Sequence, residues 1–103
     1  MIGYAISKNK IKIRLTEERW FHIVESHDYM SGLSDTVLEA ISKPDEIIAG
    51  DEGETIISKR FNNKNLIVIY REANNEDSFV ITSFLTSEID RIRKERKVIW
   101  KKE

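Results

Sequence analysis

The sequence predicts an α+β fold in which helices pack against a twisted, mainly antiparallel sheet. Two observations support this class: helix patterns gather in the first half of the chain, and the second half is dominated by strand patterns with short polar turns. Strands that are joined by short turns pair as antiparallel neighbours. We therefore expect two N-terminal helices on one face of the sheet, a C-terminal helix, and a second face that is partly open.

The chain begins with two strand patterns and a helix pattern. Residues 11–15 alternate between apolar and basic side chains, which predicts a half-buried strand, and residues 2–6 form a shorter pattern of the same kind. Thr16 can cap the helix that follows, and the two glutamates after it lie where the helix dipole favours negative charge. This helix is expected to run to Ser26 or His27.

A second helix and four strand patterns follow. The helix begins at Ser34 and ends before Pro44, because proline cannot continue a helix. The strand patterns are Asp45–Ala49, Glu54–Phe61, Leu66–Tyr70 and Ser78–Leu85. The segment Leu66–Tyr70 is apolar throughout, which predicts a central strand that is buried on both faces.

The last elements are a helix and a basic tail. Ser87 and Asp90 fit a capping box at the start of the helix, and Ile89 and Ile92 are expected to face inward. The tail carries the apolar segment Val98–Trp100, which we expect to dock back onto the domain.

Length and composition bound the possible functions. A chain of 103 residues forms a single domain, residues 1–103, and its 40% apolar content suffices for one small core. The absence of cysteine excludes a disulfide framework, a thiolate metal site and a cysteine nucleophile. No apolar run is typical of a signal peptide or a membrane span, so a cytoplasmic protein without a membrane partner is expected.

The net charge of −1 conceals an uneven distribution. Between Glu25 and Glu54 there are nine acidic residues and one basic residue, whereas from Asp90 onward seven basic residues accompany three acidic ones. If this tail meets the basic segment 8–14, the two would form a surface that attracts phosphates. The alternative is a solvated surface without a ligand. The candidate nucleic-acid-binding residues are Lys10, Lys12, Arg14, Arg93 and Lys97.

The two histidines of the chain both lie in the first helix pattern. His27 shares the apolar face with Trp20 and Ile23, whereas His22 points nearly the opposite way, about 140° round the helix. The two side chains therefore cannot chelate one metal ion while both are helical, and no metal or other cofactor is expected. Histidine side chains, whose unperturbed pKa is near 6.5, suit acid–base chemistry at neutral pH, which makes His27 the candidate. The alternatives are a packed or helix-capping role for His27 and a surface position for His22.

Three further side chains are candidates for a phosphate site. Arg60 and its neighbour Lys59 point to opposite faces of one strand, so only one of them can line an open sheet face. Thr82 and Thr86 share a strand face, and Thr86 also precedes a helix, where anions bind. Solvated cations and a plain capping role for Thr86 are the structural alternatives.

Taken in order, several short motifs resemble the phage-associated branch of the barnase–EndoU–colicin–RelE-like (BECR) ribonuclease superfamily. The matching pieces are Leu15-Thr16, Trp20-x-His22-Ile23, His27, Pro44-Asp45, Leu66–Tyr70 and Thr82–Thr86. The resemblance implies metal-independent RNA cleavage by attack of a ribose 2′-OH on the adjacent phosphate, in a toxin or phage effector.

The resemblance also implies roles for individual residues. His27 would be the base or acid, with His22 as a further catalytic candidate, Arg60 as the phosphate clamp, and Thr82 and Thr86 as hydrogen-bond donors. RNA and a cognate antitoxin or other inhibitory protein are the implied partners. The alternative function is a non-catalytic protein- or RNA-binding module, an antitoxin or an inhibitor, on the same fold.

Overall fold

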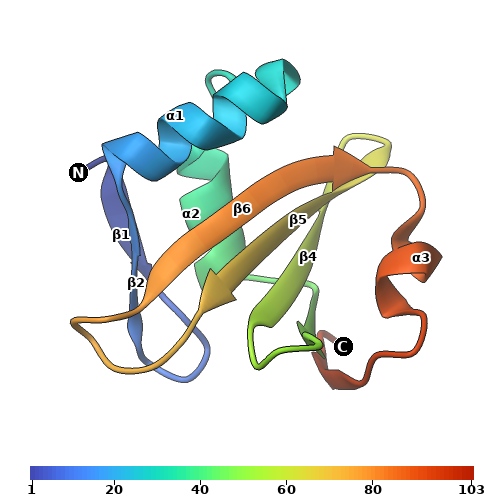
Figure 1. Ribbon diagram of the computed structural model, residues 1–103. Helices are drawn as coiled ribbons and strands as arrows, with labels where there is room; N and C mark the ends of the chain where they lie inside the picture. The colour runs from blue at the N-terminus through green and yellow to red at the C-terminus, as the bar shows by residue number, and fades with distance from the viewer.

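The computed structural model describes residues 1–103 and contains one seven-stranded sheet and three α-helices (Figure 1). The strands are β1 (Gly3–Ile6), β2 (Lys12–Leu15), β3 (Glu46–Ala49), β4 (Thr55–Phe61), β5 (Lys64–Arg71), β6 (Phe79–Thr86) and β7 (Val98–Lys101). The helices are α1 (Glu17–Ser26), α2 (Ser34–Ser42) and α3 (Ile89–Arg93), with a 3-10 turn at Asp28–Met30. The predicted α+β class is confirmed.

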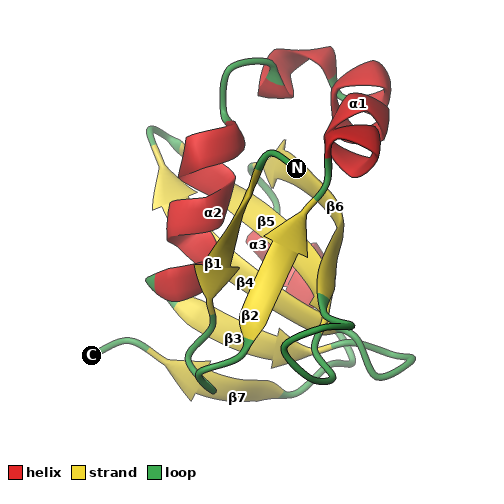
Figure 2. Ribbon diagram, turned by 90° about the vertical axis from the view of Figure 1, so that its left-hand side faces the viewer, coloured by secondary structure: helices red, strands yellow, loops and turns green.

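The strands are arranged in the order β1-β2-β6-β5-β4-β3-β7. All neighbours are antiparallel except β2 and β6, which run parallel and meet where Arg14 lies opposite Phe79. The sheet curls, so that the β1–β2 hairpin lies in front of the central strands in Figure 2. The turn of this hairpin reaches the last strand, because Lys8 Nζ lies 4.8 Å from the ring centre of Trp100.

The main core lies inside this curl. Helix α2 packs against β1, β4 and β5, and its buried residues are Val37, Ala40 and Ile41. Alternate residues of β5, Leu66 and Val68, face the same cluster. Helix α1 lies against β6 and contributes one fully buried residue, Ile23 (Figure 1). Helix α2 therefore covers the inner face of the sheet, and helix α1 covers the edge of β6.

A second, smaller apolar cluster lies on the opposite face of the sheet. It contains Ile48, Ile56 and Ile67, one from each of the strands β3, β4 and β5. Ile89 and Ile92 pack against it from α3, as the sequence predicted for these two side chains. β5 is therefore buried on both faces, which was also predicted. The second face is more covered than expected, because α3 shields its middle.

The placement of the helices differs from the prediction. The two predicted strands before α1 are present and form a hairpin. The first two helices do not share one set of strands, because α2 packs against β1, β4 and β5 whereas α1 lies against β6. The chain ends with strand β7, which pairs with β3, instead of with a helix. The expected docking of Val98–Trp100 thus occurs as strand pairing.

The predicted capping box at Ser87 is wrong. The residue before α3 is Glu88, which makes no side-chain cap. Its backbone N–H instead donates to the Thr86 hydroxyl at 3.0 Å, which turns the chain sharply at the end of β6. A helix as short as α3 is held by its packing rather than by its cap. No helix of the chain is long and apolar enough to cross a membrane.

Candidate functional site

His27 lies at the point where α1 ends. Its backbone N–H donates to the Ile23 carbonyl at 2.8 Å, and its φ of −138° takes the chain out of the helix. The half-buried imidazole packs against Phe84 of β6, with ring centres 5.8 Å apart, and against Tyr29 at 5.7 Å. The side chain thus rests on the edge of β6 that faces α1.

Tyr29 is the hydrogen-bond partner of the His27 ring. Its hydroxyl lies 3.3 Å from His27 Nδ1 and accepts the backbone N–H of Leu85 at 3.4 Å. Leu85 belongs to the part of β6 that has a strand neighbour on one side only. Tyr29 therefore ties the imidazole to the sheet through Nδ1, and no hydrogen bond engages the other ring nitrogen, Nε2.

Three polar side chains form a row across the sheet beside this histidine. Arg60 of β4 lies opposite Asn65 of β5, and Asn65 lies opposite Thr86 of β6. Residues that are directly opposite in antiparallel strands point to the same face. Phe84 lies on this face as well, two residues before Thr86, and so does Thr82, two residues before Phe84. The structure therefore brings His27, Arg60, Thr82 and Thr86 to one face of the sheet.

Arg60 is the free cation of this row. Its backbone N–H donates to Asp45 at 2.7 Å, but its exposed side chain makes no hydrogen bond or ion pair. Strands lie about 4.8 Å apart, so the backbones of Arg60 and Thr86 are separated by about 10 Å. Asn65 stands between them in the row, on the same face of the sheet.

His22 is not part of this arrangement. Its side chain is 55% exposed, lies 3.7 Å from Glu25 on the same helix, and meets the ring of Phe21 edge-on. No hydrogen bond, ion pair or ring contact joins His22 to the sheet. The structure thus separates the two histidines of α1, as their spacing in the sequence indicates.

Arg93 has an internal partner instead of a free guanidinium. It donates to the buried Glu46 from Nε at 3.1 Å and from Nη2 at 2.9 Å, and its Nη1 reaches Asp90 at 2.9 Å. Ser58 completes the shell by donating to Glu46 at 3.0 Å. The hydrogen bond to Glu46, followed by its charge, raises the pKa of Arg93 against the opposing effect of burial. Arg93, a predicted nucleic-acid-binding residue, therefore uses its guanidinium to hold α3 on the sheet.

The remaining basic candidates lie on two separate parts of the surface. Lys12 Nζ lies 4.4 Å from the ring centre of Tyr4, and Arg14 is paired with Tyr4 on the same face of the hairpin. Lys10 occupies the hairpin turn with a φ of +67°, and Lys97 is exposed just before β7. Lys12 and Arg14 form a basic outer face of the hairpin, beside an exposed aromatic ring.

The sequence also left useful residues unassigned. The strand register places Asn65 in the site, and the end of α1 places Tyr29 there. Neither residue has a local sequence signal.

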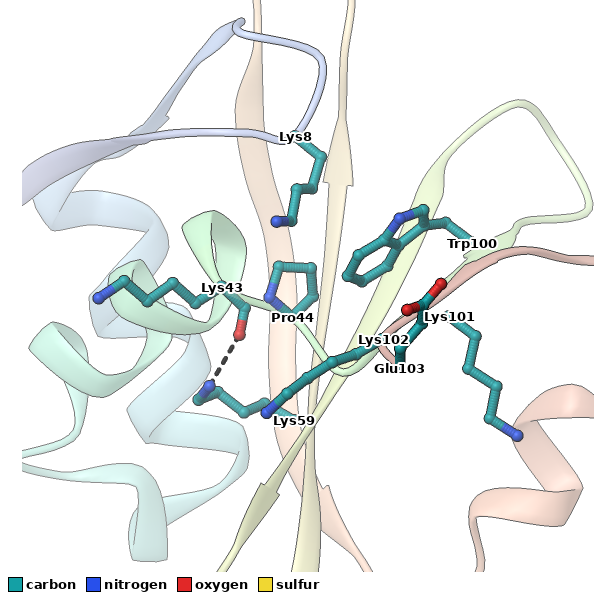
Figure 3. A pocket seen from close by; sticks show the side chains of 8 residues that line it. All are labelled: Lys8, Lys43, Pro44, Lys59, Trp100, Lys101, Lys102 and Glu103. Carbon is teal, nitrogen blue, oxygen red and sulfur yellow. Dashed lines mark hydrogen bonds between the residues drawn. The ribbon is translucent and has the colours of Figure 1, made fainter.

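A second region, the lysine pocket, gathers side chains from both ends of the chain. It is lined by Lys8, Lys43, Pro44, Lys59, Trp100, Lys101, Lys102 and Glu103 (Figure 3).

The site contains no cluster of three or more His, Asp or Glu side chains that could hold a metal ion. Comparison of the chain with protein-family models, with curated proteins and with solved structures finds no match.

Proposed function

We propose that this protein is a metal-independent endoribonuclease of toxin or phage-effector type, with its site on the sheet face beside His27. One observation carries the proposal: the imidazole of His27 rests on Phe84, on the same sheet face as the Arg60–Asn65–Thr86 row. An imidazole thus lies on the same sheet face as a cation and a hydroxyl. These are the groups that a phosphate transesterification requires.

The reaction follows from the position of each group. In the tautomer that suits a base, His27 donates Nδ1–H to Tyr29, and Nε2 takes the proton of the ribose 2′-OH. The 2′ oxygen then forms a bond to phosphorus, the bond from phosphorus to the 5′ oxygen breaks, and solvent supplies the proton to the leaving oxygen. The products are a 2′,3′-cyclic phosphate and a 5′-hydroxyl.

Arg60 and Thr86 stabilise the negative charge that develops on the phosphate in the transition state. The guanidinium offers a fork of N–H donors that matches phosphate oxygens, and the hydroxyl adds another donor. Thr82 lies further along the same strand, where it can contact the adjoining nucleotide. Tyr29 is a positioning residue, because it acts on the substrate only through the orientation of His27.

The test is cleavage of RNA by the purified protein in the presence of a chelator. His27→Ala is expected to lower the rate about 100-fold or more, the usual contribution of a general base. Arg60→Gln and Thr86→Val are each expected to lower it about tenfold or more, by loss of a donor to developing charge. RNA with a 2′-deoxy sugar at the cleaved position should be inert, since it lacks the nucleophile.

His22→Ala is the matched comparison, because it removes an imidazole from the same helix on a side that makes no contact with the sheet. We expect it to retain the wild-type rate, and circular dichroism would check that all variants are folded. Equal rates for His27→Ala and wild type would refute His27 as the base. If the folded wild-type protein cleaves no RNA, alone or with ribosomes, the non-catalytic binding module is the better assignment.

A further inference from the structure

The lysine pocket lies on the other side of the sheet from His27. Lys59 is adjacent to Arg60 in β4, so the two side chains point to opposite faces, and Lys59 pairs with Leu66 of the main-core cluster. Trp100 of β7 is paired with Ile47 of that same cluster. The pocket is therefore a separate feature from the site of the proposed cleavage.

The pocket has the size of a small-molecule site and an unusual lining. Its volume of about 520 Å³ falls in the range of ligand pockets, roughly 300–1,000 Å³. Five lysines and one glutamate line it, and its apolar walls are Trp100 and Pro44. In Figure 3 the ammonium group of Lys8 lies on one side of Pro44, near the Trp100 ring, and those of Lys59 and Lys102 lie on the other side of Pro44, whereas those of Lys43 and Lys101 point away from it. Three cations from separate parts of the chain thus line one pocket beside an indole ring.

Specific contacts hold the hairpin turn that carries Lys8. Ser7 and Asn9, on either side of Lys8, both donate to the carboxylate of Glu72 at the end of β5, Asn9 at 2.8 Å. Lys8 Nζ lies above the Trp100 ring at 4.8 Å. The hairpin turn is therefore held at the end of β5, which places Lys8 beside Trp100.

The other two cations are also placed by neighbours. Lys59 Nζ donates to the Lys43 carbonyl at 2.7 Å, where α2 ends, which leaves two of its three N–H groups free. The Lys102 backbone N–H donates to the Asp45 carbonyl at 2.8 Å, and its ammonium lies 3.7 Å from the Asp45 carboxylate. Asp45 and Glu103 are the carboxylates near the pocket, and they leave an excess of positive charge.

We propose that the lysine pocket binds a phosphorylated nucleoside, with the base against Trp100 and the phosphate between Lys8, Lys59 and Lys102. The anion neutralises ammonium groups that the fold brings together, and the indole offers a flat surface that stacks any base. The contact of Lys8 with the ring is weaker than base stacking at an exposed site, so a base displaces the ammonium and Lys8 turns to the phosphate. The nucleoside phosphate is either a free nucleotide or a unit of a single strand.

Isothermal calorimetry on the whole protein tests this directly, with ADP, adenosine, inorganic pyrophosphate and a short oligodeoxythymidylate as probes. The deoxy strand cannot be cleaved by 2′-OH attack, so its binding is independent of the proposed ribonuclease activity. ADP is expected to bind at least tenfold more tightly than adenosine, which lacks the phosphate, and than pyrophosphate, which lacks the base. Binding of the deoxy strand is assigned to the pocket only where Lys59→Gln weakens it, because the strand can also bind at the proposed cleavage site. The tighter binder at the pocket, ADP or the deoxy strand, identifies the source of the ligand.

Variants locate the binding. Lys59→Gln and Lys102→Gln should each weaken ADP about tenfold, the loss expected for one charge-assisted contact, and Trp100→Leu should weaken it by a similar factor. The matched control is Lys94→Gln, which removes one exposed positive charge from the end of α3. Thermal melting of each variant shows whether it is folded.

Three results would overturn the proposal. The first is no heat of binding for either ADP or the deoxy strand. The second is equal affinity for ADP and pyrophosphate, which would remove the base from the site. The third is an affinity that Lys94→Gln lowers as much as Lys59→Gln, which would make the attraction a general effect of charge. Loss of RNA cleavage in His27→Ala with unchanged ADP binding would show that the two sites are separate.

Discussion

Lys8, in the first hairpin turn, lies 4.8 Å from the ring centre of Trp100 on the last strand of the sheet. This contact joins the two ends of a curled sheet whose edge strands are β1 and β7. It also brings a basic residue from the beginning of the chain to the lysines of the tail, in the lysine pocket. Of the first basic segment, Lys8 meets the tail, whereas Lys12 and Arg14 lie beside Tyr4 on the outer face of the hairpin.

A double-mutant cycle measures this contact. The changes are Lys8→Met, which keeps the aliphatic stem, and Trp100→Leu. A coupling of about 0.5–1 kcal/mol in the free energy of unfolding is expected, the usual strength of a cation–π pair at a partly exposed site. Urea denaturation of the wild type, both single variants and the double variant gives the value. Additive single effects would show that the contact contributes nothing to stability.

Arg93→Ala should destabilise the protein by about 2–3 kcal/mol, because it leaves the carboxylate of Glu46 buried without its cation. The lower part of the usual range is expected, since 36% of the Arg93 side chain is exposed whereas only 4% of the Glu46 side chain is. The matched control is Arg91→Ala on the same helix, whose pair with Glu88 is exposed on both sides. The control should change the free energy of unfolding by less than about 0.5 kcal/mol. A small effect of Arg93→Ala would mean that Ser58 alone supports the carboxylate.

Lys12→Gln and Arg14→Gln should each weaken RNA binding in the same way for all sequences. Both residues lie on the outer face of the β1–β2 hairpin and would contact phosphates rather than bases. Each change is expected to reduce the slope of log affinity against log salt by about 1. Binding measured by fluorescence anisotropy at several salt concentrations, with non-cleaving His27→Ala as the background, gives the slopes. An unchanged slope in both variants would exclude this face from RNA binding.

Tyr70→Phe should flatten the loss of stability at high pH. Burial, followed by the charge of Glu72, raises the pKa of the Tyr70 phenol above its ordinary value of 10.0. A raised pKa in the folded state gives a contribution that is fully present below about pH 10 and is lost as the pH rises through the folded value, because the unfolded chain ionises first. Urea denaturation of both proteins at neutral pH and above pH 10 compares the two slopes. Parallel losses would show that Tyr70 does not couple to unfolding.

Much of the local structure is predictable from the sequence. The alternation at residues 11–15, the Thr16 cap and the proline after α2 all correspond to observed elements. Thr16, for example, accepts the Arg19 backbone N–H at 3.1 Å, as its position before two glutamates indicates. These features involve neighbours within one turn or one strand, so a short window of sequence contains all the atoms that decide them.

The site was predictable only in part. The opposite directions of Lys59 and Arg60 follow from strand periodicity. The row that joins Arg60, Asn65 and Thr86 requires the register of two hairpins, and the position of His27 on Phe84 requires the angle at which α1 crosses β6. Arg93 was a predicted nucleic-acid-binding residue because it belongs to a basic segment. In the structure its guanidinium forms an ion pair with the buried carboxylate of Glu46 on β3.

The sequence by itself determined the class of the fold, the approximate bounds of its strands and longer helices, and the separation of the two histidines, because each depends on the local period of the chain. Only the tertiary structure decided the curl of the sheet, the aromatic contact of His27 and the meeting of Lys8 with Trp100. These depend on strand order and register, which are selected by burial of the whole apolar surface at once and therefore have no signature in any single segment.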